Sequence, residues 1–343
     1  MERVNRLWEC VGGRRSAVVT GAAGFIGGHL VHALLRRGVD VIGVDTRSAQ
    51  DPRCSSMLRS CLANERLRVI QGDLRSVDLE PIVVGSDVVF HLAALTGVRE
   101  SWGDRFEDYL SVNVSATHRL VQACGQSQVP RIVLASSSSV YGGFRDGPSK
   151  EGDPPSPRSP YGVTKLAAEQ LAQTLAHHPA STTTVTALRY FSVYGPGQRP
   201  DMLISQVLQA ALTRRPVRVF GSQDQCRDFT FVDDVVAATI CAARIPAVAS
   251  VVNVGVGRPR SIREVLAVAE HVTGRSVVVE PGPPAAGDVV MTWADTTQAA
   301  QVLDCPPVTG LEEGMAATWE WTLERGRANQ VAAVGAETFG DVS

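Results

Sequence analysis

The fold of this chain is decided by the stretch Thr20-Gly21-Ala22-Ala23-Gly24-Phe25-Ile26-Gly27. An apolar, β-prone run over 16–20 leads into it, and the residues that follow predict a helix ending at Gly38. A second buried strand is predicted over 39–44 and closes at Asp45. Strand, glycine-rich turn, helix, strand and acid stand in the order of a unit that binds a dinucleotide.

The glycines and amides of this turn have separate expected roles. Gly21 permits the tight turn, Gly24 lets the backbone approach a pyrophosphate, and Gly27 lets helix and strand pack closely. The backbone amides at the helix start, where Phe25 and Ile26 stand, would face the phosphates at the positive end of the helix dipole. These residues are therefore the first candidates for cofactor binding.

The acid that ends the second strand bears on which cofactor binds. Asp45 stands where a carboxylate accepts hydrogen bonds from the adenosine ribose, and it would repel the 2′-phosphate of NADP. Arg47 is close by and could instead accommodate that phosphate. Weighing the two residues, we predict NAD as the cofactor.

Length and composition set the class of protein. A chain of 343 residues, 44% hydrophobic and 20% charged, is typical of a globular protein with one large or two moderate domains. A net charge of -2 without a long basic run gives no sign of nucleic acid or an anionic membrane as a partner. No window approaches the ~20 apolar residues that span a bilayer. Residues 1–15, which we interpret as a leader, lack the pattern of a signal peptide.

The cysteines and histidines predict no metal site. Seven cysteines are scattered along the chain without a Cys-x-x-Cys pair, so neither a disulfide framework nor a zinc site is indicated. The seven histidines form no set with the spacing of metal ligands. A reducing, cytoplasmic location fits this cysteine usage best.

Further apolar runs extend the predicted sheet. Runs over 67–70, 88–91 and 131–135 are typical of parallel strands that are buried on both faces, and another strand is predicted over 183–188. In an open α/β sheet, ligands bind beyond the carboxyl ends of the strands. The residues that follow the first three of these runs include Asp73, Leu74, Leu92, Ala93, Ala94 and the serine run 136–139.

The pattern of predicted helices and strands changes after residue 190. Helices are predicted over 203–211 and 262–271, and they alternate with short strands over 217–220 and 251–254. We therefore predict an α/β fold, a Rossmann-type doubly wound parallel sheet with a smaller, mostly C-terminal substrate lobe. The predicted division is the leader, a mainly NAD-binding domain over 16–190, an interleaved lobe over 191–325 and a loosely ordered tail over 326–343.

A helix that carries a tyrosine and a lysine is predicted to begin near Pro160. Ser159 suits the N-cap, and Pro160 suits the first helical position. Tyr161 and Lys165 then lie on one helix face. A lysine beside a tyrosine favours the phenolate, and such a tyrosine can serve as a general base near pH 7. Taken alone, the pair is more often a surface pair, so the other motifs must decide.

Taken together, the motifs resemble the extended short-chain dehydrogenase/reductase superfamily and, within it, the nucleotide-sugar 4-epimerases. The resemblance covers about 16–325 of the chain. Its marks are the glycine stretch 20–27, Gly72-Asp73-Leu74, His91-Leu92-Ala93-Ala94, residues 136–142, Tyr161 to Lys165, and Arg227-Asp228-Phe229.

The resemblance implies roles for the residues that match these motifs. Ser137 is similar to the catalytic serine, Tyr161 to the base, and Lys165 to the residue that binds the nicotinamide ribose and lowers the tyrosine pKa. The implied reaction is internal. Tyr161 removes the C4 hydroxyl proton as hydride passes to NAD, the 4-keto sugar turns about its diphosphate link, and the hydride returns to the other face. The remaining implied cofactor contacts are Asp73, Leu74, Leu92, Ala93, Ala94, Asn113 and Tyr190.

The resemblance also bears on the substrate, which would be a UDP-sugar. Related 4,6-dehydratases carry Asp-Glu after the catalytic hydroxyl residue, and related glucuronate decarboxylases carry a glutamate at the position of Ser139, so Ser138-Ser139 favours simple epimerisation. Gly97-Val98-Arg99 and the segment 191–202 are similar to UDP-glucuronate 4-epimerases. The preferred reaction is therefore UDP-glucuronate to UDP-galacturonate.

Individual substrate contacts follow from the same resemblance. A hydroxyl at Ser192 could donate to a carboxylate, and Arg199 could grip a diphosphate or carboxylate. The arginine or glutamine often found before Gly-Asp in the family is missing before Gly287-Asp288. The other expected contacts are Arg99, Ser138, Ser139, Val219, Phe220, Arg227 and Asp288.

Three alternatives stay open. The enzyme could be a UDP-glucose or UDP-N-acetylglucosamine 4-epimerase, the chain could be a catalytically silent regulator that binds NAD or a nucleotide sugar, or it could be a net dehydrogenase or reductase. The resemblance further implies a homodimer joined through helices at 104–126 and 160–176.

Overall fold

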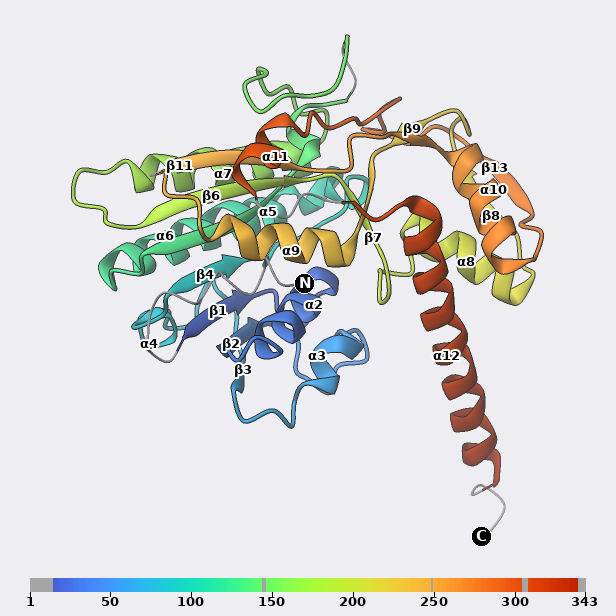
Figure 1. The fold of residues 1–343 in the computed structure, drawn as a ribbon, viewed down its shortest axis with the longest axis horizontal. Coiled ribbons are helices and arrows are strands. Elements are labelled where there is room, and N and C mark those ends of the chain that lie inside the picture. The colour runs from blue at the N-terminus through green and yellow to red at the C-terminus, as the bar shows by residue number, and fades with distance from the viewer. Residues whose placement is uncertain (1–14, 144–145, 248, 304–307, 339–343) are drawn as a thin grey trace.

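A parallel sheet forms the centre of the molecule. The computed structural model describes residues 15–143, 146–247, 249–303 and 308–338, so the expected leader lies outside the described residues except for Arg15. Within this part, seven strands pair in the order β11-β6-β5-β4-β1-β2-β3 (Figure 1). They are β1 (Ser16–Thr20), β2 (Asp40–Asp45), β3 (Leu67–Gln71), β4 (Val88–His91), β5 (Arg131–Ser137), β6 (Thr184–Tyr190) and β11 (Ala249–Val254). The predicted Rossmann-type fold is confirmed, and the strand order reverses between β1 and β4, where such sheets bind ligands.

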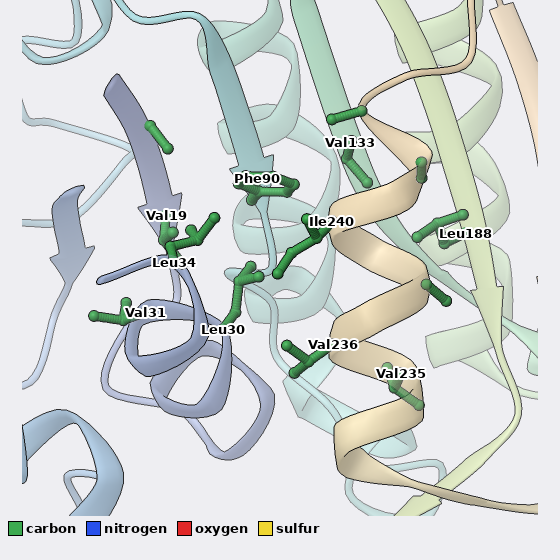
Figure 2. Close-up of a cluster of buried hydrophobic side chains, with 14 of the residues drawn as sticks. Val19, Leu30, Val31, Leu34, Phe90, Val133, Leu188, Val235, Val236 and Ile240 are labelled. Atoms are coloured by element: carbon green, nitrogen blue, oxygen red, sulfur yellow. The ribbon is translucent and has the colours of Figure 1, made fainter. Parts of the chain in front are cut away.

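Helices cover both faces of this sheet. On one face, α2 (Phe25–Leu35), α9 (Val232–Ala242) and α11 (Thr297–Val302) share one apolar cluster with the strands. In Figure 2, side chains of α2 and α9 meet over Phe90 of β4. The opposite face is covered by α4 (Glu80–Val83), α6 (Ala116–Gln126) and α7 (Pro160–Ala176). The short α3 (Ser56–Ser60) packs beside α2.

A smaller lobe has its own core. Apolar residues of α8 (Leu203–Thr213), α10 (Ile262–Thr273) and α12 (Leu311–Thr338) pack there against short strands. Three pairs of strands belong to it in the described part of the chain: β7 (Ser192–Tyr194) with β10 (Phe229–Phe231), β8 (Val217–Phe220) with β13 (Val279–Gly282), and β9 (Cys226–Arg227) with β12 (Arg260–Ser261). α10 begins with a capping box between Ser261 and Glu264 and ends at the left-handed Gly274.

The strand β11 corrects one expectation. The sequence predicts this strand as part of the smaller lobe, but β11 pairs with β6 at the edge of the large sheet. The preceding helix α9 packs against the large sheet as well. A short apolar run fits an edge strand of either lobe, so its periodicity cannot say which sheet it joins.

The C-terminal segment corrects another expectation. The chain was expected to be loosely ordered from 326, whereas α12 continues to Thr338. Its C-terminal half extends away from the body of the molecule (Figure 1). Alanine, glutamate, arginine and glutamine favour a helix by their own propensity, without the apolar periodicity on which the prediction relied.

Two further features are not indicated by the sequence. The predicted helix over 104–126 is interrupted, because α5 (Phe106–Tyr109) passes into the π-helical segment Leu110–Ser115 before α6 begins. Cys241 on α9 is disulfide-bonded, which the spacing of the cysteines did not indicate. Cysteine spacing along a chain does not show which thiols the fold brings together. In the described residues, no helix is both long and apolar enough to cross a membrane.

A buried histidine makes the stability of the sheet depend on pH. His91 ends β4, is 1% exposed, and hydrogen bonds through its two ring nitrogens to Thr20 (2.7 Å) and Thr117 (2.8 Å). Burial, assisted by the charge of Lys165, lowers the pKa of His91 from 6.5 to about 3. Between these pH values the unfolded chain binds a proton at this residue that the folded chain does not.

We therefore expect the free energy of unfolding to fall as the pH drops below 6.5, by roughly 1 kcal/mol per pH unit from His91 alone. The variant His91→Gln keeps hydrogen-bonding groups and removes the titration, so its stability should fall less over the same range. Urea unfolding of both proteins at about pH 7 and about pH 5 measures the difference. Equal losses of stability would contradict the assignment.

Candidate active site

The glycine turn between β1 and α2 is packed against the end of β4. Gly21 has a φ of 72°, a conformation that favours glycine, and a Cβ there would lie 2.8 Å from the backbone of Leu92 and Ala93. A Cβ on Gly27 would lie 2.1 Å from the carbonyl oxygen of Gly21. Both glycines therefore stand where a side chain would displace backbone, as the sequence predicted.

The start of α2 suits an anion. α2 begins at Phe25, and the preceding Gly24 provides no side-chain cap for the first amides. Phe25 and Ile26 pack partly buried against the core, which anchors the helix start. Uncapped amides at the positive end of a helix form a ready site for a phosphate, so the geometry fits the cofactor contacts predicted for Gly24, Phe25 and Ile26.

Asp45 and Arg47 are bound to each other. Asp45 is 7% exposed, and its two oxygens accept from the amide of Ala23 (3.1 Å), the amide of Arg47 (3.0 Å), and Nε (3.0 Å) and Nη2 (3.1 Å) of Arg47. The arginine that complicated the choice of cofactor thus forms a bidentate pair with the acid. Ribose hydroxyls would have to share or replace these donors to bind Asp45.

The ends of β3 and β4 carry the other predicted cofactor residues. Asp73 pairs with Arg75 (2.7 Å), whose side chain lowers the Asp73 pKa, and Leu74 is buried beside it. Leu92, Ala93 and Ala94 follow β4 directly and are partly buried.

Asn113 braces this segment from the π-helical turn. Its side chain accepts from the amide of Leu95 (2.8 Å) and donates to the carbonyl of Leu95 (3.0 Å) and the hydroxyl of Thr164 on α7 (3.0 Å). The residue predicted to line the cofactor cleft therefore joins the end of β4 to the helix that carries Tyr161.

Tyr161 and Ser137 meet at the carboxyl end of β5. α7 begins as predicted, with Ser159 accepting from the amide of Gly162 (3.1 Å) and Pro160 in the first turn. Ser137 is the last residue of β5, and its hydroxyl hydrogen bonds with Tyr161 and accepts from the amide of Ser139 (3.1 Å). The serine and the tyrosine, far apart in the sequence, are thus in direct contact.

Lys165 hydrogen bonds to the strand β5. It lies on the same face of α7 but is buried, and its Nζ donates to the carbonyl of Ala135 (2.5 Å). Burial raises the pKa of Tyr161, against which the hydrogen bond from Ser137 and the charge of Arg199 act. In this structure the ammonium group is engaged with β5 instead, and the expected lowering of the Tyr161 pKa by Lys165 stays a prediction. Burial also lowers the pKa of Lys165, to about 8.

The hydroxyl of Tyr190 points to another part of the structure and bonds to α9. Tyr190 ends β6, is buried in the cluster beneath α2 and α9, and hydrogen bonds to Thr239 of α9 (2.7 Å). Burial raises its pKa. Its predicted contact with a cofactor stays a prediction.

Several of the residues predicted to bind substrate lie together in a cluster that is separate from Ser137 and Tyr161. Asp288 accepts from Arg99 (3.2 Å) and lies 3.8 Å from Arg227, while the guanidinium of Arg99 stands 4.3 Å from the ring centre of Phe220. Val219 is buried beneath this cluster. Two arginines beside an aromatic ring suit an anion attached to a flat base.

The remaining residues predicted to bind substrate are Ser138, Ser139, Ser192 and Arg199. Ser138 and Ser139 form the helical turn directly after Ser137. Ser192 begins β7, and its amide donates to the carbonyl of Asp228 (2.9 Å). Arg199 is paired with Asp201 and donates to Thr96. Its positive charge acts to lower the pKa of Tyr161.

Two groups of residues at the site were missed by the sequence reasoning. Tyr109 of α5 stacks edge-on against Tyr161, with ring centres 6.3 Å apart. Glu169 and Arg189 form a buried ion pair behind Lys165. The only signal for Glu169 is its position one turn after Lys165 on the same helix face. Within the described ranges, no three histidine, cysteine or acidic side chains are grouped to hold a metal ion.

Known proteins share this architecture and these motifs. Residues 17–255 match the family described as NAD dependent epimerase/dehydratase family. A Bacillus subtilis protein described as an uncharacterised UDP-glucose epimerase is 38% identical over 302 residues, which is 87% of this chain and 95% of that protein.

Two of the similar proteins have been solved with both a nucleotide sugar and NAD. MoeE5 was solved with NAD and either UDP-glucose or UDP-glucuronic acid, and it is 47% identical, with TM-scores of 0.84 and 0.83. The UDP-glucuronic acid 4-epimerase from Bacillus cereus, solved with UDP-glucuronic acid and NAD, is 35% identical, with a TM-score of 0.85. Each comparison covers 90% of this chain and 99% of the other.

Proposed function

Since the chain belongs to the NAD dependent epimerase/dehydratase family, we propose that it is an NAD-dependent UDP-sugar 4-epimerase. The preferred reaction is UDP-glucuronate to UDP-galacturonate through a 4-keto intermediate. The observation that carries the proposal is the hydrogen bond of Ser137 with Tyr161 at the carboxyl end of β5, in a sheet whose first helix, α2, begins with uncapped amides. Relatives solved with UDP-glucuronic acid and NAD, at 47% and 35% identity, support the choice of cofactor and substrate.

The residues of the chain divide the chemistry between them. When bound, oxidised NAD supplies the hydride acceptor for C4 and a positive charge that opposes the effect of burial on Tyr161. Tyr161 accepts the proton of the C4 hydroxyl and returns it after the sugar has turned. Ser137 holds the phenol oxygen in place through its hydrogen bond. Lys165, buried against β5, is proposed to supply a positive charge one helical turn from the tyrosine.

The turn after Ser137 distinguishes this reaction from dehydration. A 4,6-dehydratase needs an acid next to the catalytic hydroxyl to remove water from the keto sugar. Ser138 and Ser139 occupy that turn, so the chain lacks a side chain for this step at those positions. Arg99, Arg227 and Asp288, with Phe220, are proposed to hold the UDP group, and Arg199 and Ser192 to face the sugar.

Product analysis with separate UDP-sugars tests the proposal. The purified protein should convert UDP-glucuronate to UDP-galacturonate faster than it converts UDP-glucose or UDP-N-acetylglucosamine, without net change in absorbance at about 340 nm, because the hydride returns to the sugar. Turnover of UDP-glucose alone would overturn the substrate and favour the epimerase named for the Bacillus subtilis relative. Binding without turnover of any sugar would indicate a silent binding protein.

Ser192 should control the preference for a carboxylate. The variant Ser192→Ala removes a hydroxyl proposed to donate to the C6 carboxylate, and we expect kcat/KM for UDP-glucuronate to fall by about 10-fold or more. The value for UDP-glucose should change much less, because its C6 carries a neutral hydroxyl. The matched control is Ser60→Ala, which removes an exposed hydroxyl on α3 and should leave both values unchanged. An equal loss for both sugars would contradict the role of Ser192.

The proposal includes a homodimer and a cytoplasmic location. The segments expected to join a homodimer carry exposed apolar side chains, namely Phe106 (38%), Leu110 (41%) and Val163 (45%). Covering such residues with a second copy would remove apolar surface from water. A molar mass in solution equal to that of one chain would contradict the dimer. The cytoplasmic location stays a prediction, which cell fractionation tests.

A further inference from the structure

A buried network of polar side chains lies directly behind Ser137 and Lys165. At its centre, Glu169 of α7 and Arg189 of β6 are 1% and 3% exposed. Arg189 donates Nη2 to one oxygen of Glu169 (2.6 Å) and Nε to the other (3.1 Å). The second oxygen also accepts from the hydroxyl of Ser136 (2.6 Å). This geometry is bidentate and almost fully removed from water, so the carboxylate is held in one position.

The network joins α7 to three successive residues of β5. The carbonyl of Ala135 accepts from Lys165, the hydroxyl of Ser136 donates to Glu169, and the hydroxyl of Ser137 bonds with Tyr161. Only the first and last of these contacts involve the proposed catalytic side chains. The middle contact, through Glu169, fixes the strand residue between them.

Arg189 extends the network to the neighbouring loop and to β11. Its Nη1 donates to the hydroxyl of Tyr141 (2.9 Å) and to the carbonyl of Glu151 (3.1 Å). Tyr141 in turn donates to Asn253 of β11 (2.7 Å). Arg189, which makes two of the three hydrogen bonds to Glu169, is therefore itself held by other elements, which leaves the carboxylate little freedom to move.

The charge of Glu169 acts on Lys165, one helical turn away. Burial lowers the Lys165 pKa to about 8, and Glu169 acts in the opposite direction. The other titratable groups around this lysine are Tyr161 on its own helix and His91 on β4, whose pKa burial and Lys165 lower to about 3. His91 is therefore neutral near pH 7, and Glu169 is the acid that favours the charged lysine. Arg189 on β6 is paired with the same Glu169 carboxylate.

We propose that Glu169 is a positioning residue of the active site, which holds Ser136 beside Ser137 and keeps the Lys165 side chain charged at neutral pH. This inference rests on the proposed function for its effect on catalysis. Its electrostatic part concerns the chain alone and can be tested without substrate or cofactor.

The sequence offers an unusually clean measurement, because Lys150 and Lys165 are the only lysines of the chain. Protein labelled with ¹³C at the lysine ε-carbons should give two NMR signals, and Lys150, which is exposed, serves as the internal reference. In the unaltered protein the Lys165 signal should titrate near pH 8. A Lys165 signal that is already neutral at pH 7 would overturn the proposal, whatever the variants do.

In Glu169→Gln the Lys165 midpoint should move to lower pH, while the Lys150 signal stays unchanged. Because this variant leaves Arg189 buried without its partner and can fail to fold, the double variant Glu169→Gln/Arg189→Met is measured beside it. The matched control is Ser136→Ala, which removes a neutral donor to the same carboxylate and should leave the Lys165 midpoint in place. A Lys165 midpoint that is unchanged in whichever glutamine variant folds would overturn the electrostatic role.

The effect on catalysis is read separately. For Glu169→Gln, the alkaline limb of the kcat profile should shift to lower pH together with the Lys165 signal. A merely structural role would lower kcat equally at all pH values. If neither protein turns over a UDP-sugar, the proposed function fails, and the NMR titration still decides the role of Glu169.

Discussion

Replacing Tyr161 by phenylalanine is expected to lower the rate of epimerisation by about 10³-fold or more, within the range that general acid–base catalysis contributes. The substitution removes the one oxygen that contacts Ser137 at the end of β5 and leaves the ring beside Tyr109. The phenylalanine ring has no group that can accept the C4 proton. NAD and UDP-sugar affinities should change little, because the ring keeps its packing. The decrease should therefore appear in kcat and not in KM.

The measurement is product formation from UDP-glucuronate at saturating substrate, with binding of NAD followed separately. The matched control is Tyr194→Phe, which removes a buried hydroxyl in the smaller lobe whose contacts are carbonyls at 310 and 311. This control should retain most of the activity. If Tyr161→Phe keeps more than about a tenth of the native rate, another group is the base.

Replacing Gly27 by alanine is expected to abolish measurable NAD binding at ordinary concentrations, a loss of affinity of about 100-fold or more. The new Cβ would lie 2.1 Å from the carbonyl oxygen of Gly21, which itself accepts from the amide of Gly24 (2.9 Å). The backbone of the turn must move to relieve this contact, because no flexible side chain is there to give way. Overpacking of this kind also lowers the free energy of unfolding, typically by about 1–3 kcal/mol.

A second glycine in a helix provides the matched control. Gly125 lies in α6, and a Cβ there would meet nothing within 4 Å. Gly125→Ala should leave NAD binding unchanged and stabilise the protein by up to about 1 kcal/mol, since alanine is the better helix former. Calorimetric titration with NAD and thermal unfolding of both variants separate the effects. Equal NAD affinities for the two variants would contradict the role assigned to the turn.

The sequence predicts best those parts of the fold that depend on local stereochemistry. The glycine turn needs a positive φ at Gly21 and an empty Cβ position at Gly27, and glycine is the residue that meets both demands. The start of α7 followed likewise from Ser159 and Pro160. The assignment of β11 failed because its neighbour, β6, lies some sixty residues away in the chain.

The positions of some residues of the candidate site could be predicted from the sequence, but their electrostatic environment could not. Helical spacing correctly places Tyr161 and Lys165 on one face, but it cannot show that the long lysine side chain turns to the carbonyl of Ala135. The partners of Glu169 come from β5 and β6, so no local pattern marks them. Contacts between distant segments decide pKa values, and the sequence alone does not reveal those contacts.

The path of the chain between the two lobes limits how this enzyme can be re-engineered. After β6 the chain enters the smaller lobe, returns to the large sheet for α9 and β11, and leaves again for α10. A hybrid that exchanged everything after residue 190 with a relative would also exchange one strand of the large sheet, β11, and two of its covering helices, α9 and α11. The residues that determine substrate specificity therefore do not form one contiguous segment that can be exchanged. Grafting single loops is a better way to alter specificity than exchanging whole lobes.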